Sequence, residues 1–306
     1  MFKIYYKNIR NIELQEIKQF KKGSWLYVSN PTEKDIEKLV KKYGLEEGLI
    51  RDATDEYEVP RFEQEDGIIY IFTRHVYEIN DKIYTAPLMI AISDSFVLTV
   101  CNNQSSPLQL FLNNKVEFNT TQKTKFLLRT LLLVNQEYKK YIHKINKQAT
   151  NFSSKLEKIE NKDIIKFVEY ERTLNAFLAA LVPSSIVFER IIYDNAIKLY
   201  EEDEDLAEDL SLSNGQLIEI AKSSIRHISN VREAYTTITS NNLNTRMKWL
   251  TSITVILTIP TIISSFYGMN VPLPLQNNAL AYAWIGGITL LVVIILTLLF
   301  MYKKMF

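Results

Sequence analysis

The sequence is poor in cysteine and glycine, and its last 66 residues contain no acidic residue. The single cysteine, Cys101, cannot form a disulfide within the chain, which excludes a disulfide framework and suits a reducing compartment. None of the eight glycines lies in a GxxxxGK or GxGxxG pattern, so no phosphate-binding loop is predicted. The three histidines, His75, His143 and His227, are far apart and none adjoins Cys101, which gives no soft-metal site of recognisable spacing. We therefore expect that the protein is not an enzyme.

Charge is distributed unevenly along the chain. The first 240 residues hold 32 basic and all 35 acidic residues, a net charge of −3, whereas the remainder carries +4 from Arg246, Lys248, Lys303 and Lys304. The negative N-terminal part argues against a nucleic-acid partner. The N-terminal residues MFKIYYKN lack the apolar segment of a cleaved signal peptide, so we expect this part to stay in the cytoplasm.

Two apolar stretches near the C-terminus are each long enough to cross a lipid bilayer. The first, Trp249 to Tyr267, has 19 residues without a charge, and the second extends from Ala279 to Tyr302. Arg246 and Lys248 flank the start of the first stretch, and Lys303 and Lys304 follow the second. By the positive-inside tendency, both termini lie in the cytoplasm and the uncharged loop 268–280 lies outside. We expect a multi-pass protein of the cell membrane.

A stripe of polar and small side chains runs along the first stretch at alternating spacings of three and four residues, which places them on one face of a helix. We name it the polar stripe, and it comprises Asn244, Met247, Thr251, Thr254, Thr258, Thr261, Ser265 and Gly268. Lipid offers no partners to hydroxyls and amides, so the stripe must face other helices or water. One interpretation is hydrogen bonding between membrane helices. The other is a pore lining made by several copies, which the unbroken polarity up to Gly-Met-Asn at 268–270 favours.

The first 120 residues predict an α/β domain in which an antiparallel or mixed sheet is covered by helices. Apolar and β-branched runs separated by turn residues predict strands, and apolar spacing of three and four predicts helices. The expected strands lie near Ile4 and at Trp25–Val28, Ile68–Val76, Ile83–Ile92 and Phe96–Val100, and the expected helices lie after Pro31 up to Gly44 and around Leu49–Ala53.

Beyond residue 120 the pattern is almost wholly helical. Residues 121–210 predict two long cytoplasmic helices, at 122–158 and 162–200. Residues 211–248 predict a stalk helix that continues into the membrane, so that one helix extends from Gln216 to Tyr267, about 78 Å at ~1.5 Å per residue. Since a bilayer core takes about 30 Å of this length, roughly 50 Å remains for the stalk. Residues 249–306 form the expected two-helix membrane domain.

The run FYGMN at 266–270, between two C-terminal spans and before a basic tail, resembles the CorA-type divalent-cation channels. The resemblance extends to SNNLN at 240–244, MKWLT at 247–251, and PRFE at 60–63 with GIIYIF at 67–72, and so covers nearly the whole chain. It implies a funnel-shaped homopentamer with an α/β/α cytoplasmic domain. In such an assembly the stalk helix lines the pore and the second span forms an outer ring.

The resemblance also implies roles for particular residues. Gly268, Met269 and Asn270 would form the ion filter at the external face. Independently of the resemblance, the place of Met247 in the polar stripe at the cytoplasmic membrane face, with Leu250 one turn along, predicts a hydrophobic gate, and Asn244 would be the polar ring beneath it. Glu233, on the same helical face, would add a ring of carboxylates that concentrates cations. For Met247 and Leu250, ordinary helix packing is the alternative, and for Asn270 the alternative is a helix cap.

Two acids resemble the pair that regulates the family by binding Mg²⁺ across a subunit interface. Asp52 follows LIR in the short helix before PRFE, and Asp209 ends the acidic run 35 residues before Asn244. Loss of the bound ion would let like charges repel and open the channel. The alternative is that Asp52 is a surface acid and that Glu201–Asp209 is a solvated charged run.

The pore chemistry suits magnesium. Mg²⁺ holds its waters tightly and prefers oxygen ligands, and rings of Asn270 carbonyls and threonine hydroxyls can hydrogen-bond its hydration shell. No histidine or thiolate in the polar stripe favours a softer ion. We expect passive Mg²⁺ uptake without a cofactor, with Co²⁺ and Ni²⁺ as further candidate ions. The loop VPLPLQNNA at 271–279 departs from the family pattern, because it lacks the carboxylate of a Met-Pro-Glu-Leu motif. A zinc-transporting relative and a non-transporting membrane-anchored scaffold or sensor are the alternatives.

Overall fold

A computed structural model describes residues 1–10, 13–153, 161–193, 197–274, 278 and 280–303 of the chain. These residues fall into two compact units, Met1–Val231 and Arg232–Phe306. Each unit is described by itself below.

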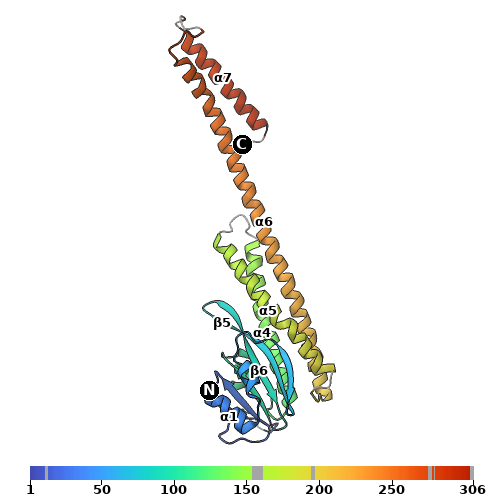
Figure 1. The fold of residues 1–306 in the computed structure, drawn as a ribbon. Coiled ribbons are helices and arrows are strands. Elements are labelled where there is room, and N and C mark those ends of the chain that lie inside the picture. Colours follow the sequence, from blue (N-terminus) through green and yellow to red (C-terminus); the bar gives the residue numbers. More distant parts are fainter. Residues whose placement is uncertain (11–12, 154–160, 194–196, 275–277, 279, 304–306) are drawn as a thin grey trace. The chain divides into compact units, whose positions relative to one another are not determined.

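The first unit is built on a seven-stranded mixed sheet (Figure 1). The strand order is β2-β1-β3-β7-β6-β5-β4, and every neighbouring pair is antiparallel except β3 and β7, which run parallel. The expectation of a mixed sheet is therefore confirmed. The strands are β1 (Phe2–Tyr6), β2 (Gln15–Glu16), β3 (Ser24–Ser29), β4 (Arg61–Glu65), β5 (Ile68–Ile79), β6 (Lys82–Ile92) and β7 (Phe96–Cys101).

Helices cover both faces of this sheet. On one face, α1 (Glu33–Tyr43) and α2 (Glu47–Asp52) pack their buried residues Ile36, Leu39 and Ile50 into a core with alternate strand residues. The other face is covered by α3 (Ser106–Leu112), α4 (Lys123–Ser153) and α5 (Asn161–Tyr193). Side chains alternate across a strand, so consecutive residues of β3 serve the two cores.

The indole of Trp25 is the centre of the second core. It is fully buried among the rings of Phe111, Phe118 and Phe126, and its Nε1–H donates to Thr99 Oγ1 at 2.9 Å. The neighbouring residue Leu26 belongs to the core beneath α1 and α2. This arrangement places a three-layer α/β/α domain at the N-terminus.

Several elements differ from the sequence-based expectation. The predicted helix 162–200 ends at Tyr193, and residues 197–200 are not helical, while residues 194–196 lie outside the described part. The predicted helix 122–158 is α4, whose residues 154–158 also lie outside it. Strands β2 and β4 and helix α3 were not expected. Helix α3 carries a signal that predicts it, because Ser105 precedes Ser106 and Pro107 at its start.

Helix α6 (Glu201–Tyr267) starts well before the expected Gln216. Its first turn is the acidic run Glu201–Glu204, and carboxylates at a helix N-terminus are stabilised by the helix dipole. The run is therefore helical rather than a connecting segment. Gly215 does not interrupt the helix.

In the first unit, α6 buries one narrow line of residues, which we name the α6 seam. Its members recur at spacings of four and three, the heptad pattern of helices that pack side by side. They are Asp203, Ala207, Leu210, Asn214, Leu217, Ala221, Ser224, Ile228 and Val231. The rest of this part of α6 is exposed or half-buried, so the seam defines which face of the helix packs against its own chain.

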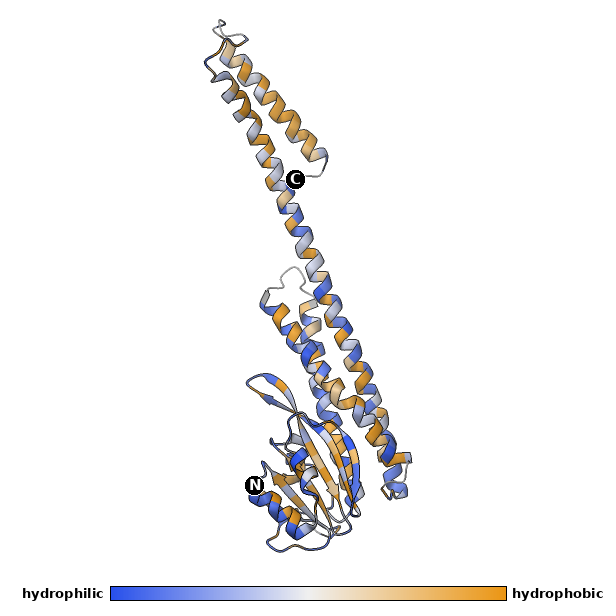
Figure 2. Cartoon of the chain, in the orientation of Figure 1, coloured by the Kyte–Doolittle hydropathy of each residue, from blue (hydrophilic) through white to orange (hydrophobic). Residues whose placement is uncertain are grey.

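The second unit contains the end of α6 and the helix α7 (Ala281–Tyr302), and the predicted start of the second span at Ala279 lies outside the described residues. Within the part of the chain that the structure describes, three helices, α5, α6 and α7, are long and apolar enough to cross a membrane. The apolar window is 39% buried in α5, but only 6% in α6 and 0% in α7. Figure 2 shows apolar residues along α7 and the later part of α6. Burial within the first unit therefore explains the apolar face of α5, but it does not explain the apolar surfaces of α6 and α7.

Candidate functional site

The polar stripe lies on the exposed surface of α6. All of its members, from Asn244 to Gly268, are exposed, and Met247 is 52% exposed. Leu250, at 55%, lies beside the stripe. Such polar groups on a helix otherwise rich in isoleucine and leucine require water or other helices as partners.

A different face of α6 is turned to α7. The residues of α6 that are least exposed here are apolar apart from Ser252, which is fully buried, and they include Ile256, Ile259 and Ile263. The corresponding half-buried residues of α7 recur at helical spacing and are Ile285, Thr289, Val292, Leu296 and Phe300. At ~100° per residue, the face of α6 turned to α7 and the polar stripe lie on roughly opposite sides of the helix. The stripe therefore does not serve packing between the two candidate spans of one chain.

The threonine hydroxyls of the stripe have a defined orientation. Thr254, Thr258 and Thr261 each donate to the carbonyl four residues earlier, at 2.8, 2.7 and 3.0 Å. With the hydroxyl hydrogen engaged, the exposed side of each oxygen offers lone pairs only. A file of such oxygens can accept hydrogen bonds from the waters of a hydrated cation.

The Gly-Met-Asn segment follows directly on the last residue of α6. The Gly268 N–H donates to the carbonyls of Ser264 and Ser265 at 3.0 and 3.2 Å and so closes the last turn of the helix. A Cβ at Gly268 would lie 3.4 Å from the Ser264 oxygen, an ordinary van der Waals contact. Asn270 is exposed and its amide makes no hydrogen bond to the described residues. Because the Asn270 side chain does not cap the end of α6, its amide is available for another role.

Residues of the loop after Asn270 are described only in part. Val271 to Pro274 lie within the described residues, whereas 275–277 and 279 lie outside them. The predicted cytoplasmic basic residue Lys304 also lies outside.

Asp52, the first expected regulatory acid, ends α2 and is half-buried. Its carboxylate accepts from the Arg61 guanidinium at 2.7 Å, and Arg61 also contacts Glu58 and, at 3.4 Å, Glu63. Burial lowers the pKa of Arg61, but the hydrogen bonds that its guanidinium donates to Glu58 and Asp52, and the charges of these two carboxylates, outweigh it and leave the pKa raised. The Asp52 carboxylate is thus already paired with a cation of its own chain.

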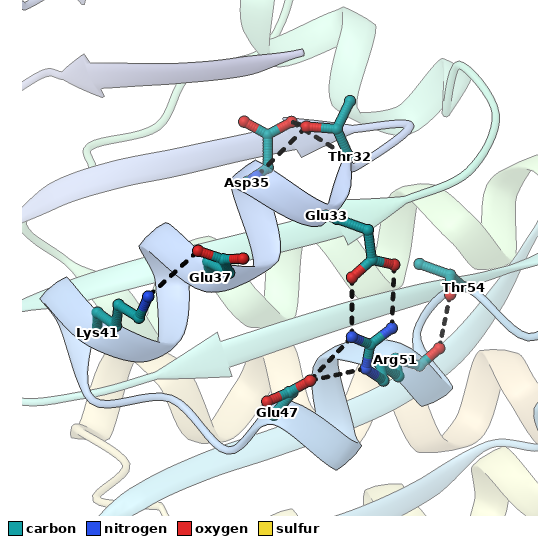
Figure 3. Close-up of polar contacts among 8 residues, drawn as sticks. All are labelled: Thr32, Glu33, Asp35, Glu37, Lys41, Glu47, Arg51 and Thr54. Atoms are coloured by element: carbon teal, nitrogen blue, oxygen red, sulfur yellow. Dashed lines mark hydrogen bonds and ion pairs between the residues drawn. The ribbon is translucent and has the colours of Figure 1, made fainter.

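Neighbouring ion pairs fix the position of α2 (Figure 3). Arg51 makes a two-pronged pair with Glu33 of α1, at 3.1 and 2.8 Å, and its Nε donates to Glu47 at 2.9 Å. Hydrogen bonds to these two acids raise the pKa of Arg51. The Arg51 carbonyl accepts from Thr54 at 2.7 Å. This network holds the short helix against α1 and thereby sets the position of Asp52.

Asp209, the second expected acid, is exposed on α6. The helix α6 packs through its seam on the α4–α5 layer, whereas α2 covers the opposite face of the sheet, so the structure does not bring the two acids together within one chain. Among the described residues there is no group of three or more His, Cys, Asp or Glu side chains that could hold a metal ion. A metal site at Asp52 and Asp209 requires a second copy of the chain.

Exposed residues of α6 continue the spacing of the polar stripe toward the start of the helix. Glu233 is exposed, and its carboxylate makes no ion pair to the described residues. The positions at matching spacing before it are also exposed, and they are Glu219, Ser223, Arg226 and Asn230. Their heptad spacing is the signal that could have identified them.

Comparisons with known proteins identify the family and the fold of the chain. Residues 20–304 match the family model described as CorA-like Mg²⁺ transporter protein. The chain is 25% identical over 288 residues to the cobalt/magnesium transport protein CorA of Methanocaldococcus jannaschii, which covers 92% of this chain and 90% of that protein.

Solved structures show the same fold. The complete CorA magnesium transporter of Methanocaldococcus jannaschii superposes with a TM-score of 0.86 at 20% identity, covering 98% of this chain and 97% of that one. The ZntB cytoplasmic domain of Vibrio parahaemolyticus gives 0.64 at 9% identity, covering 78% of this chain and 99% of that domain. With a family model matched over nearly its whole length, the chain belongs to the CorA-like Mg²⁺ transporter family.

Proposed function

We propose that the protein is a magnesium channel that mediates passive uptake of divalent cations and is inhibited by intracellular Mg²⁺. The observation that carries the proposal is the polar stripe, which is exposed on α6, opposite the face turned to α7, and ends at Gly268, Met269 and Asn270. Several copies that turn this face to a common axis enclose a polar path. The proposed assembly is a homopentamer.

The proposed membrane arrangement follows from the apolar surfaces. The end of α6 and α7 expose large apolar side chains, among them Trp249 at 54%, Leu257 at 64% and Trp284 at 61%. Soluble proteins rarely leave so continuous an apolar surface in water. We place these two segments in the bilayer, with both termini on the cytoplasmic side as the flanking basic residues favour.

The driving force is electrical. A membrane potential contributes about 2.3 kcal/mol per charge per 100 mV, so a divalent ion gains ~4.6 kcal/mol on entry. This supports roughly a thousandfold accumulation without any coupled reaction. Acceptor oxygens at Thr254, Thr258 and Thr261 suit the passage of an ion that keeps its waters.

A zinc-conducting channel of the same fold is the second candidate. The described part of the external loop, Val271 to Pro274, contains no carboxylate. Its electrostatic attraction for Mg²⁺ is therefore weaker than that of an acidic loop, and this absence is the observation that favours the zinc-conducting candidate. A non-transporting scaffold is the third candidate, and in that case we expect no ion flux at all.

The test is uptake in a cell that lacks its own magnesium transport. We expect the chain to restore growth at low Mg²⁺ and to carry Mg²⁺ rather than Zn²⁺ in proteoliposomes. Zinc uptake without magnesium uptake would establish the second candidate. If neither ion is transported although the protein is folded in the membrane, the non-transporting scaffold would be the remaining candidate.

A further inference from the structure

One polar side chain interrupts the apolar α6 seam with a bond to another helix. Asn214 is 1% exposed, and its Nδ2 donates to the Leu181 carbonyl at 2.9 Å and to Ser185 Oγ at 2.8 Å, both on α5. Its Oδ1 is buried without a hydrogen-bond partner among the described residues. The buried Ser224, by contrast, donates within its own helix to the Ile220 carbonyl at 2.6 Å.

The acceptors for Asn214 occur at one turn of α5. Pro183 lies inside this helix and has no N–H, so the regular ladder of backbone hydrogen bonds is interrupted there. Ser184 and Ser185 direct their hydroxyls to the Ala180 and Leu181 carbonyls at 2.9 and 3.5 Å. The two serines thus concentrate polar groups at this turn that a side-chain amide can bind, whereas one heptad away along α5 an amide would lie opposite the buried Leu174 or Phe188.

The apolar contacts by themselves allow more than one alignment. Helices α5 and α6 follow each other after a short connection, which favours antiparallel packing. The buried residues of α5 repeat every seven positions, as Phe167, Leu174, Leu181 and Phe188, like those of the α6 seam. A shift of one heptad, about 10 Å at ~1.5 Å per residue, returns apolar side chains to apolar neighbours. It would also move Asn214 opposite Leu174 or Phe188, where Leu178 or Ile192 takes the place of Ser185 and the amide loses its hydroxyl partner.

We infer that Asn214 is a positioning residue that fixes the axial register of α6 against α5. A buried asparagine in a heptad seam specifies register when its side-chain partner occurs in one alignment only, because the other alignments place the amide beside apolar side chains. Asn135 of α4 supports the same alignment, since its Nδ2 donates to the Leu210 carbonyl of α6 at 3.4 Å. The register itself depends only on contacts within the first unit. Its consequence for ion uptake rests on the proposed function.

Replacing Asn214 with leucine distinguishes a role in positioning α6 against α5 from a role in stabilising the fold. Asn214→Leu removes a buried oxygen without a partner and restores the apolar heptad, and such replacements are often neutral or stabilising. We therefore expect the melting temperature of Asn214→Leu to be no lower than that of the unsubstituted chain. If the role of Asn214 were merely structural, the variant would melt at a lower temperature.

Disulfide cross-linking of the full-length protein in detergent measures the register of α6 against α5 directly. The chain has a single cysteine, so Cys101→Ala provides a clean background. Leu178 and Ala221 lie one heptad from the contacting pair Ser185 and Asn214 in an antiparallel alignment, and cysteines at both positions report the native register. Cysteine pairs at 178 and 228, and at 171 and 221, report shifts of one heptad in the two directions.

In the background protein we expect the cross-link of the native pair only. In Asn214→Leu we expect the two shifted pairs to rise from background to a yield comparable with the native pair. The matched control Ser224→Ala, which loses a polar group from the same seam, should give the native pair alone. Cross-linking of the native pair alone in Asn214→Leu, or a clearly lowered melting temperature, would overturn the inference.

Uptake by the same variants tests the consequence for the pore separately. We expect Asn214→Leu to lose regulated Mg²⁺ uptake while Ser224→Ala retains it. If the unsubstituted chain carries no ion, the proposed function fails, but the cross-linking result still decides the register.

Discussion

At the scale of single residues, His75 on β5 is an ionisable group held without charge. It is fully buried, its Nε2 has no hydrogen-bond partner among the described residues, and its Nδ1 lies 3.4 Å from the Val76 carbonyl. Burial lowers the pKa of His75 from 6.5 to about 4. In the unfolded chain the same imidazole takes up a proton near its ordinary pKa.

This difference makes the stability of the first unit depend on pH. Because the unfolded state binds the proton first, the free energy of unfolding should fall as the pH decreases from about 6.5 toward 4, by up to about 3 kcal/mol. We expect His75→Phe to flatten this part of the profile, measured as melting temperature against pH in detergent. The exposed His227 provides the control, because His227→Phe should leave the slope unchanged. An equal slope in the unsubstituted chain and His75→Phe would show that other groups control it.

Asn270 supplies the second residue-scale prediction. Its amide is exposed just beyond the end of α6 and is not used as a helix cap. We expect Asn270→Ala to abolish Mg²⁺ uptake in the complemented strain, because the amide oxygen can no longer hydrogen-bond the hydrated ion. Melting temperature and oligomeric state should not change.

The matched control for Asn270 is Asn242→Ala, since Asn242 is an exposed asparagine of α6 outside the polar stripe. That variant should transport normally. Normal uptake by Asn270→Ala would remove this residue from the filter.

At the scale of elements, α6 divides its surface between two tasks. Its seam packs against the first unit, and its exposed face bears the polar stripe, with Met247 and Leu250 at the expected cytoplasmic end. Both side chains are more than half exposed in the single chain, so neither is needed for packing within it. In the proposed assembly, rings of these side chains can exclude water from a narrow pore and so close it.

We therefore expect Met247→Gly and Leu250→Gly to raise ion flux at high internal Mg²⁺, measured in proteoliposomes with a fluorescent indicator. Glycine also weakens a helix by about 1 kcal/mol, so Val255→Gly, outside the stripe, is the control for that effect. Equal flux from all three glycine variants would assign the effect to helix weakening. Loss of folded protein in the first two alone would indicate packing in the assembly.

At the scale of the whole molecule, the two acids proposed for regulation need a second copy. Asp52 and Asp209 belong to helices on opposite sides of the sheet, so only contact between chains can bring such residues together. We expect millimolar Mg²⁺ to protect the detergent-solubilised protein from limited proteolysis. Asp52→Ala/Asp209→Ala should lose this protection, because the ion would no longer hold neighbouring chains together.

The control for this pair is Glu56→Ala/Asp205→Ala, which removes exposed acids from the same two segments. It should remain protected. Because Arg61 pairs with Asp52 at 2.7 Å, Arg61→Gln should shift protection to lower Mg²⁺ concentrations. Protection of the Asp52→Ala/Asp209→Ala protein equal to that of the unsubstituted chain would exclude both acids from the sensor.

The sequence by itself determined much of the local structure and the family. The β-branched and aromatic runs of β5 to β7 and the apolar spacing in α1 depend on neighbouring residues, so these elements could be predicted without knowing what they pack against. The FYGMN run and the two charge-free stretches were equally local, and the family match over residues 20–304 confirmed the resemblance they carried.

Other features were decided only by the tertiary structure. The apolar composition of α5 is compatible with a membrane span, and only its packing against the sheet shows that its apolar face belongs to a core. The pairing of Asp52 with Arg61 and of Asn214 with Leu181 joins residues whose contact no local pattern specifies. Periodicity states which face of an element is apolar, but the partner of that face depends on contacts between residues distant in the chain. For this reason the sequence predicted the polar stripe, whereas only the structure showed that α7 leaves it uncovered.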